Sequence, residues 1–203
     1  MNVLVVGHDE IATVVGREFD DSAPHDIVWL WCDPTRELIE AHPGAMWVIS
    51  TPLPVGTCAA LEEQYPDKTF VVVPENVRAA YAGKDFESQD RIIVGAREHD
   101  DRIVALLAPF TKRVLWMSPE SAEMVKHALN GFLAVQVAYG NEIGRLCELV
   151  GADANDVVRG LRSDARIGDN AYLVPGSPPG PHLQREVARL LDIGAGPLVA
   201  AAR

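Results

Sequence analysis

Two polar residues, Lys126 and Asn130, interrupt an otherwise apolar stretch in the second half of the chain. They are spaced i, i+4, so in a helix they lie on the same face, one turn apart. An ammonium and a carboxamide placed side by side can hold an oxygen that becomes negative during a reaction. If they have no such task, each needs an internal partner, because an unsatisfied buried polar group costs roughly 1–3 kcal/mol. The alternative is that Lys126 reaches solvent and Asn130 caps a neighbouring loop.

Further polar residues follow apolar runs that are typical of strands. Glu75 comes after the run at 69–73, and Thr51 and Pro52 come after the run at 46–50. Open α/β sheets bind ligands at the carboxyl ends of their strands. We therefore expect Glu75 near a bound ligand, and Thr51 and Pro52 near a cofactor. The residues that follow Glu75 are candidates for substrate binding: Asn76, Val77 and Arg78. The alternative for each is a polar residue that caps a loop.

The first strand ends at a turn where a dinucleotide could bind. A dinucleotide-binding turn needs glycines for the tight bend and for the approach of the pyrophosphate, and a small residue for packing. Gly7 and Ala12 fit the first and third of these positions, but Asp9 stands at the second. Asp33, after the second strand, is placed to accept a hydrogen bond from a ribose hydroxyl. The order of elements thus favours a dinucleotide, and the charge at Asp9 opposes one.

Strands and helices must alternate to position these residues. We expect strands at 2–6, 26–31, 46–50, 69–73, 91–94 and 114–117, and helices at 10–19, 34–40, 56–64 and 102–107. The strands are continuous apolar runs, which is typical of a parallel sheet covered on both faces. This pattern predicts an α/β fold with a reduced, Rossmann-like parallel sheet in a first domain at 1–117.

A second, all-α domain is expected at 118–203. Ser118 and Pro119 open a helix that nothing but glycines interrupts before Val150, which gives a rod of roughly 48 Å. Its middle is apolar on nearly every side, so it needs to be covered on every side. We therefore predict a homodimer built on this helix at 118–150. Its three glycines would let backbones approach closely, or they only weaken the helix. Further helices are expected from the cap at Asp153 to Leu161 and at 182–191, followed by a frayed tail.

The composition excludes several classes of protein. The formal net charge is −11, which disfavours binding to nucleic acid. No apolar run approaches the ~20 residues that span a membrane, and the N-terminus does not resemble a signal peptide, so we expect a cytoplasmic protein. The three cysteines are widely spaced and the six histidines have no ligand-like spacing, so neither a disulfide framework nor a metal site is expected.

Five segments occur in an ordered series. They are STPLPVGT at 50–57, PENVRAAYAGKDFESQDRIIVG at 74–95, the long segment 121–158, ARIG at 165–168 and LVPG at 173–176. They resemble, at similar spacing, motifs of the UDP-glucose/GDP-mannose dehydrogenase family, among them STVPVGT, PEFLREGxAxxDFxxPDRIVIG and EAExxKxxxNxFLAxxIxFxNExxxLCExxGAD. The resemblance covers about residues 46–190.

The resemblance implies roles for individual residues. Thr51, Glu75, Lys126 and Asn130 match active-site positions, where the lysine and asparagine stabilise a developing alkoxide and the threonine and glutamate assist through water. The family also implies NAD as cofactor and dimerisation through the central helix. Residues near the end of the motif series are expected to contact a sugar nucleotide, in part within the partner subunit: Arg166, Tyr172 and Gly176.

The chain departs from the family at the second oxidation step. The family forms a thioester on the cysteine of GGSCFPKD, whereas this chain has GPHLQRE, with His182 at the cysteine position and Glu186 at the aspartate position. The resemblance also does not extend to a stretch before Met46 or to the family's C-terminal nucleotide-sugar-binding domain. An imidazole cannot carry the thioester step, so full UDP-glucose 6-dehydrogenase activity is not expected.

Three hypotheses follow. The first is an NAD-dependent, dehydrogenase-like enzyme limited to a two-electron alcohol/carbonyl step or related oxyanion chemistry, with Glu75 and His182 as candidate proton carriers and Glu186 as a further catalytic candidate. The second is a non-catalytic dimer, which would be a pseudoenzyme, a partner subunit or a ligand sensor. The third is an enzyme similar to the β-hydroxyacid dehydrogenases, which also place a lysine and an asparagine one turn apart and act on small acids.

Overall fold

The structure is a computed structural model that describes all residues except 8–9, 20–23, 76–81, 88 and 203. The chain forms two compact units, Met1–Lys126 and His127–Arg203. The division falls inside one long helix, α6 (Pro119–Val150), whose first turns belong to the first unit.

The first unit is built on a six-stranded sheet with the strand order β1-β2-β3-β4-β5-β6. The strands are β1 (Val3–Val6), β2 (Ile27–Leu30), β3 (Met46–Ile49), β4 (Phe70–Val72), β5 (Ile92–Gly95) and β6 (Val114–Met117). Neighbouring strands are parallel except β4 and β5, which are antiparallel and meet at Val72 and Gly95. The predicted α/β class is therefore confirmed, with one antiparallel pair that continuous apolar runs cannot signal, because they carry no information about strand direction.

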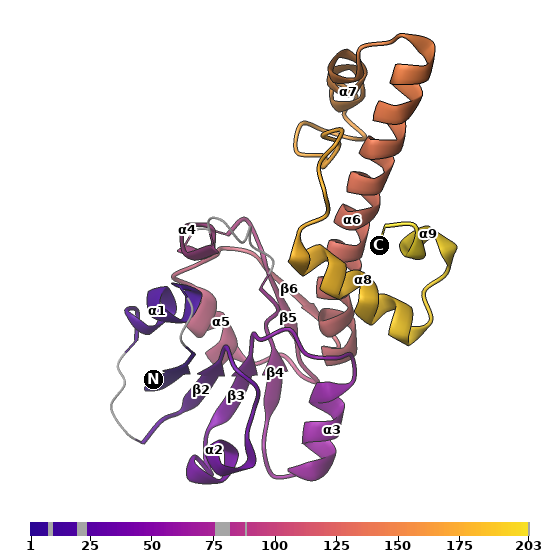
Figure 1. The fold of residues 1–203 in the computed structure, drawn as a ribbon. Coiled ribbons are helices and arrows are strands. Elements are labelled where there is room, and N and C mark those ends of the chain that lie inside the picture. Colours follow the sequence, from indigo (N-terminus) through magenta and orange to yellow (C-terminus); the bar gives the residue numbers. More distant parts are fainter. Residues whose placement is uncertain (8–9, 20–23, 76–81, 88, 203) are drawn as a thin grey trace. The chain divides into compact units, whose positions relative to one another are not determined.

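Helices cover both faces of this sheet, which explains why its central strands are apolar throughout (Figure 1). Alternate residues such as Trp29 and Val48 pack against α1 (Glu10–Gly16), α4 (Ala82–Glu87) and α5 (Asp101–Leu107). Their neighbours Leu30 and Trp47 pack against α2 (Arg36–Ala41), α3 (Thr57–Gln64) and the first turns of α6. Helix α4 lies in a segment for which no helix was predicted from the sequence.

The second unit is helical. After α6 come α7 (Ala154–Arg162), α8 (Pro181–Ile193) and α9 (Pro197–Ala200). The predicted caps are confirmed: Ser118 Oγ accepts from the N–H of Ser121 at the start of α6, and Asp153 accepts from two N–H groups at the start of α7. The prediction of a frayed tail was wrong, because α9 forms and Ala202 is buried against the cluster that joins α6 to α8.

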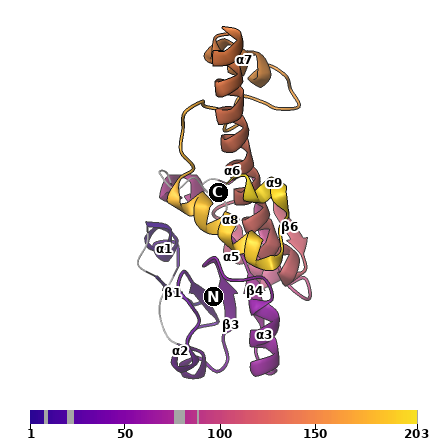
Figure 2. The ribbon, with the colours of Figure 1, turned by 45° about the vertical axis from the view of Figure 1, so that its right-hand side comes forward.

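The three glycines of α6 lie where other parts of the second unit come closest to the helix. A Cβ atom at Gly131 would be 2.4 Å from a methyl of Leu190, and one at Gly140 would be 2.9 Å from the backbone of Leu173. At Gly144 it would be 2.8 Å from a proline ring carbon. The segment that follows α7 runs back along α6 toward α8 (Figure 2). The close approach expected from the sequence is therefore to the chain's own segments.

Candidate functional site

Lys126 forms the centre of the candidate site in the first unit. Its Nζ donates to the main-chain carbonyl of Glu75 at 2.6 Å and lies 3.3 Å from the carboxylate Oε1 of the same residue. The two side chains are 11% and 23% exposed. A cation and an anion thus meet directly after β4, largely shielded from water. This shielding strengthens any interaction they make with a charge that develops nearby.

The loop after β3, which carries Thr51 and Pro52, is tied to the end of β4 by the buried Ser50. Trp29 Nε1 donates to Ser50 Oγ at 2.8 Å, and Ser50 Oγ donates to the carbonyl of Val73 at 2.7 Å. Both Thr51 and Pro52 are half-buried. Since β3 and β4 are adjacent and parallel, their carboxyl ends lie at the same edge of the sheet, and the Ser50 contacts fix the two loops to each other.

Glu123 holds the same loop to α6, and it was not singled out in the sequence. Its carboxylate accepts from the N–H of Gly56 at 2.6 Å and from the N–H of Cys58 at 2.8 Å, and the residue is 6% exposed. It therefore caps α3 from a position one helical turn before Lys126. An acidic residue in a turn that also contains Ala122 and Val125 was the signal in the sequence, because a carboxylate buried among apolar residues needs donors.

Cys58 does not replace the cysteine that the family uses. The thiol is buried at the start of α3, and burial, together with the negative charges of Glu62 and Glu123, raises its pKa to about 12. A thiol with this pKa stays protonated near neutral pH and is a poor nucleophile. Cys147 is also buried, in the second unit.

Gly7 and Asp33 follow the adjacent strands β1 and β2, where a dinucleotide was expected. A Cβ atom at Gly7 would lie 2.7 Å from the Cβ of Trp31 and 3.1 Å from that of Ala12, so the space above this glycine is filled by the protein itself. Asp33 is exposed, and β1 is an edge strand in a sheet whose order never reverses. Dinucleotides bind where the strand order reverses. The edge position of β1 therefore does not favour a dinucleotide at this turn, and Asp9, at the position that the pyrophosphate approaches, lies outside the described residues.

The two catalytic candidates expected on α8 have different surroundings. His182, in the first turn, is exposed. Glu186 is 4% exposed, and its carboxylate forms a short contact with Nδ1 of the buried His127 and accepts from Arg189 Nη1 at 2.9 Å. The carboxylate of Glu186 thus has partners inside the second unit. His127 was not singled out in the sequence, where a lone histidine beside Lys126 gave no sign of its partner.

The remaining candidates lie in the second unit or outside the described residues. Arg166 is exposed and pairs with Asp164 at 2.6 Å. Two others are held on α6 through their backbone N–H groups: that of Tyr172 donates to Gln136, and that of Gly176 donates to Asn141. Asn130 is half-buried. Three candidates lie outside the described residues: Asn76, Val77 and Arg78.

Among the residues that the structure describes, no group of three or more His, Cys, Asp or Glu side chains could hold a metal ion. No helix in the described part of the chain has the length and hydropathy needed to cross a bilayer.

Comparison with known proteins gives consistent results. Residues 120–195 match the UDP-glucose/GDP-mannose dehydrogenase family, central domain. UDP-glucose 6-dehydrogenase of Pseudomonas aeruginosa is 39% identical over 131 residues, which cover 57% of this chain and 29% of that protein. The chain thus spans less than a third of the length of this relative.

Solved structures show the same fold. A UDP-glucose dehydrogenase from Pyrobaculum islandicum matches with a TM-score of 0.70 and 23% identity, over 97% of this chain and 51% of that one. The 3-hydroxyisobutyrate dehydrogenase of Mycobacterium tuberculosis matches with a TM-score of 0.73 and 15% identity, over 99% and 90%. Residues 120–195 are therefore similar to the central domain of the UDP-glucose/GDP-mannose dehydrogenase family, in line with the ordered motifs of the sequence and with the UDP-glucose 6-dehydrogenase relatives.

Proposed function

We propose that the first unit carries an oxyanion-holding site for a two-electron alcohol/carbonyl interconversion, in which the alcohol proton goes to a carboxylate and the hydride to a nicotinamide dinucleotide supplied as co-substrate. The observation that carries the proposal is the shielded contact between Lys126 and Glu75 at the carboxyl edge of the sheet. The carbonyl of Glu75 orients the ammonium, and the longer contact to Oε1 leaves room for exchange with a ligand oxygen. An ammonium fixed in this way stabilises an alkoxide as its charge develops.

Glu75 is the proposed proton acceptor for the alcohol, directly or through a water held by the Thr51 hydroxyl. Asn130 is the proposed second donor to the oxygen, and Arg166, Tyr172 and Gly176 the proposed contacts to a nucleotide-sugar ligand, on the resemblance to the family. His182 and Glu186 carry no step in this proposal.

Turnover of candidate nucleotide sugars tests the proposal. Mass spectrometry of ligands retained by the purified protein selects the compounds, and their oxidation in the presence of NAD or NADP as hydride acceptor is followed by product analysis. Lys126→Ala is expected to lower turnover by about 100-fold or more. The matched control is Lys112→Ala, which removes an exposed lysine of the same unit and should leave turnover unchanged. Equal turnover in the Lys126→Ala protein would refute the proposed role of Lys126.

The proposed reaction depends on binding of a nicotinamide dinucleotide, which the resemblance to the family supports and the edge position of β1 opposes. Calorimetry of the purified protein with NAD and with NADP tests it without requiring turnover. Saturable binding that Asp33→Ala weakens would support a dinucleotide site at the ends of β1 and β2. Absence of heat at millimolar NAD at two well-separated temperatures would exclude one, because a binding enthalpy that is zero at one temperature is not zero at the other.

We further propose a homodimer through α6. Its second-unit part exposes large apolar side chains at heptad-like spacing, Phe132 (59%), Tyr139 (50%), Leu146 (41%) and Leu149 (70%). Sedimentation velocity should give a dimer that the double variant Phe132→Glu, Tyr139→Glu dissociates. The control Leu198→Glu alters an exposed apolar residue of α9 and should leave the dimer intact. A monomeric wild-type protein at micromolar concentration would contradict the proposal.

A second candidate function is a non-catalytic ligand-binding dimer. It is favoured by the partners of Glu186, because the acid at the family's catalytic aspartate position is bound to His127 and Arg189. Saturable binding of a nucleotide sugar without turnover, in the presence of NAD, would favour this candidate over the enzyme.

A further inference from the structure

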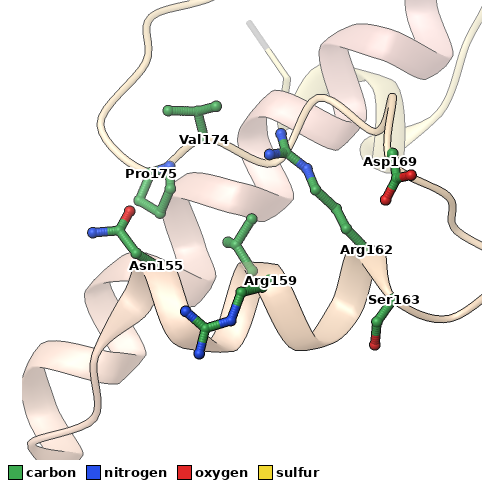
Figure 3. A pocket seen from close by; sticks show the side chains of 8 residues that line it. Asn155, Arg159, Arg162, Ser163, Asp169, Val174 and Pro175 are labelled. Carbon is green, nitrogen blue, oxygen red and sulfur yellow. The ribbon is translucent and has the colours of Figure 1, made fainter.

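The second unit contains a cavity of about 500 Å³ between α7 and the segment 169–175 (Figure 3). This volume is within the range of small-molecule sites. All its lining residues belong to the second unit, and none of them is a candidate residue of the site around Lys126. Arg162 and Asp169 contribute opposite charges to it, and Val158, Val174 and Pro175 contribute an apolar wall.

Arg162 is a positioned cation. Its Nε and Nη2 both donate to the carbonyl of Ala171, at 3.3 and 2.8 Å, which fixes the guanidinium at the end of α7. Figure 3 shows the side chain reaching from α7 toward the neighbouring segment. No carboxylate among the described residues pairs with it, whereas the nearby Arg159 is paired with Asp156 at 2.9 Å. The other N–H groups of Arg162 are therefore available to an anion, and a guanidinium suits a phosphate in particular.

Asp169 lines the same cavity and is exposed, with no ion-pair partner among the described residues. A carboxylate has only acceptors, so its natural ligand partner is a hydroxyl or an amine. The wall formed by Val158, Val174 and Pro175 offers apolar contact between the two charged ends. A ligand that matches Arg162, Asp169 and the apolar wall carries an anionic group at one end, hydroxyl groups at the other end and a ring between them.

We propose that this cavity binds a phosphate monoester of a hydroxyl-bearing compound, such as a sugar phosphate or a nucleoside monophosphate. Arg162 holds the phosphate, and Arg159 on the preceding turn of α7 lines the same cavity, paired with Asp156. Asp169 accepts from a hydroxyl of the sugar, and the ring packs on the wall that contains Pro175. Binding at this cavity does not depend on the chemistry proposed for Lys126. A ligand bound in the cavity would lie outside the site around Lys126.

Calorimetry of the full chain with glucose 6-phosphate and with uridine monophosphate tests the proposal, and inorganic phosphate and glucose serve as reference probes. The titrations are made with the wild-type and the Lys126→Ala proteins, so that binding at the first unit is not counted. Arg162→Lys keeps the charge but loses the fork, and should weaken binding about tenfold. Asp169→Asn should weaken it about threefold. The control Arg145→Ala removes an exposed arginine of the same unit that pairs with Glu142.

The site is supported if a phosphate monoester binds saturably and this binding is unchanged in the Lys126→Ala and Arg145→Ala proteins. The same binding should be weaker in the Arg162→Lys and Asp169→Asn proteins. Two results overturn it: no saturable binding of either ester to the Lys126→Ala protein, or equal affinity in the Arg162→Lys protein. Inorganic phosphate bound as tightly as the esters would overturn the ligand class. If Arg162→Lys does not fold, Asp169→Asn decides, because Asp169 makes no ion pair within the described residues and its replacement leaves α7 intact.

Discussion

Replacement of Glu123 by alanine should destabilise the first unit strongly for a single residue. The substitution removes the acceptor of two backbone N–H groups, those of Gly56 and Cys58. The Cys58 contact is buried and the Gly56 contact is partly buried, so water replaces the second bond better than the first. A buried donor without a partner costs about 1–3 kcal/mol, which gives an expected loss of about 2–4 kcal/mol for the two together.

The assay is urea unfolding followed by tryptophan fluorescence. All four tryptophans lie before Lys126, so the signal reports the first unit. Glu123→Gln keeps one acceptor oxygen and should lose about half as much stability. The matched control is Glu120→Ala, one turn earlier on α6, whose carboxylate pairs with Arg97 at 2.6 Å and is 39% exposed. Exposed pairs of this kind contribute about 0–1 kcal/mol. If Glu123→Ala unfolds at the same urea concentration as Glu120→Ala, the carboxylate does not cap α3 in solution.

Three further predictions concern packing, a thiol and a cap. Gly140→Ala should destabilise the second unit by about 1–3 kcal/mol, because the added Cβ would meet the backbone of Leu173. Gly160→Ala should stabilise α7 by about 0.5–1 kcal/mol, because nothing lies within 4 Å of the added Cβ. Thermal unfolding followed by circular dichroism measures both effects. Cys58 should resist alkylation in the native protein at pH 8 and react after unfolding, as mass spectrometry will show. Because its folded pKa is raised to about 12, its contribution to stability is complete below the unfolded pKa of about 9 and is lost as the pH rises toward 12. Asp153→Ala should cost about 1 kcal/mol by removing the cap of α7, measured by the same thermal unfolding.

Local chemistry made much of the fold predictable. The caps at Ser118 and Asp153 act between residues two or three apart in the chain, and continuous apolar runs need cover on both faces of a sheet. The direction of β5 was not predictable, because an apolar run packs equally well in either direction. Helix α4 lies in a polar segment whose one fully buried side chain, Phe86, gives no helical periodicity.

The candidate site was predictable only as a set of residue types. Lys126 and Glu75 were singled out for their positions, but their contact spans 51 residues, and no spacing rule connects them. Glu123 and His127 were missed for the same reason, since each has its partner in a distant segment, Glu123 at the start of α3 and His127 at Glu186. Polar residues in an apolar helix indicate that they have hydrogen-bond or ion-pair partners, but the sequence does not identify those partners.

The contact between Lys126 and Glu75 bears on both candidate functions, because its two parts differ. The bond from Nζ to the main-chain carbonyl is short at 2.6 Å, and the approach to the carboxylate is longer at 3.3 Å. A ligand oxygen can therefore replace the carboxylate at the ammonium while the carbonyl bond keeps the side chain in place. Since the ammonium of Lys126 keeps the carbonyl of Glu75 as a partner, the site stays intact without a ligand. The burial of the ammonium then favours a ligand that brings a negatively charged oxygen. A sensor needs only that exchange, whereas an enzyme also needs the displaced carboxylate of Glu75 to take a proton and a nicotinamide co-substrate to accept the hydride. Both candidate functions therefore use Lys126, and they differ in whether Glu75 accepts a proton after it leaves the ammonium.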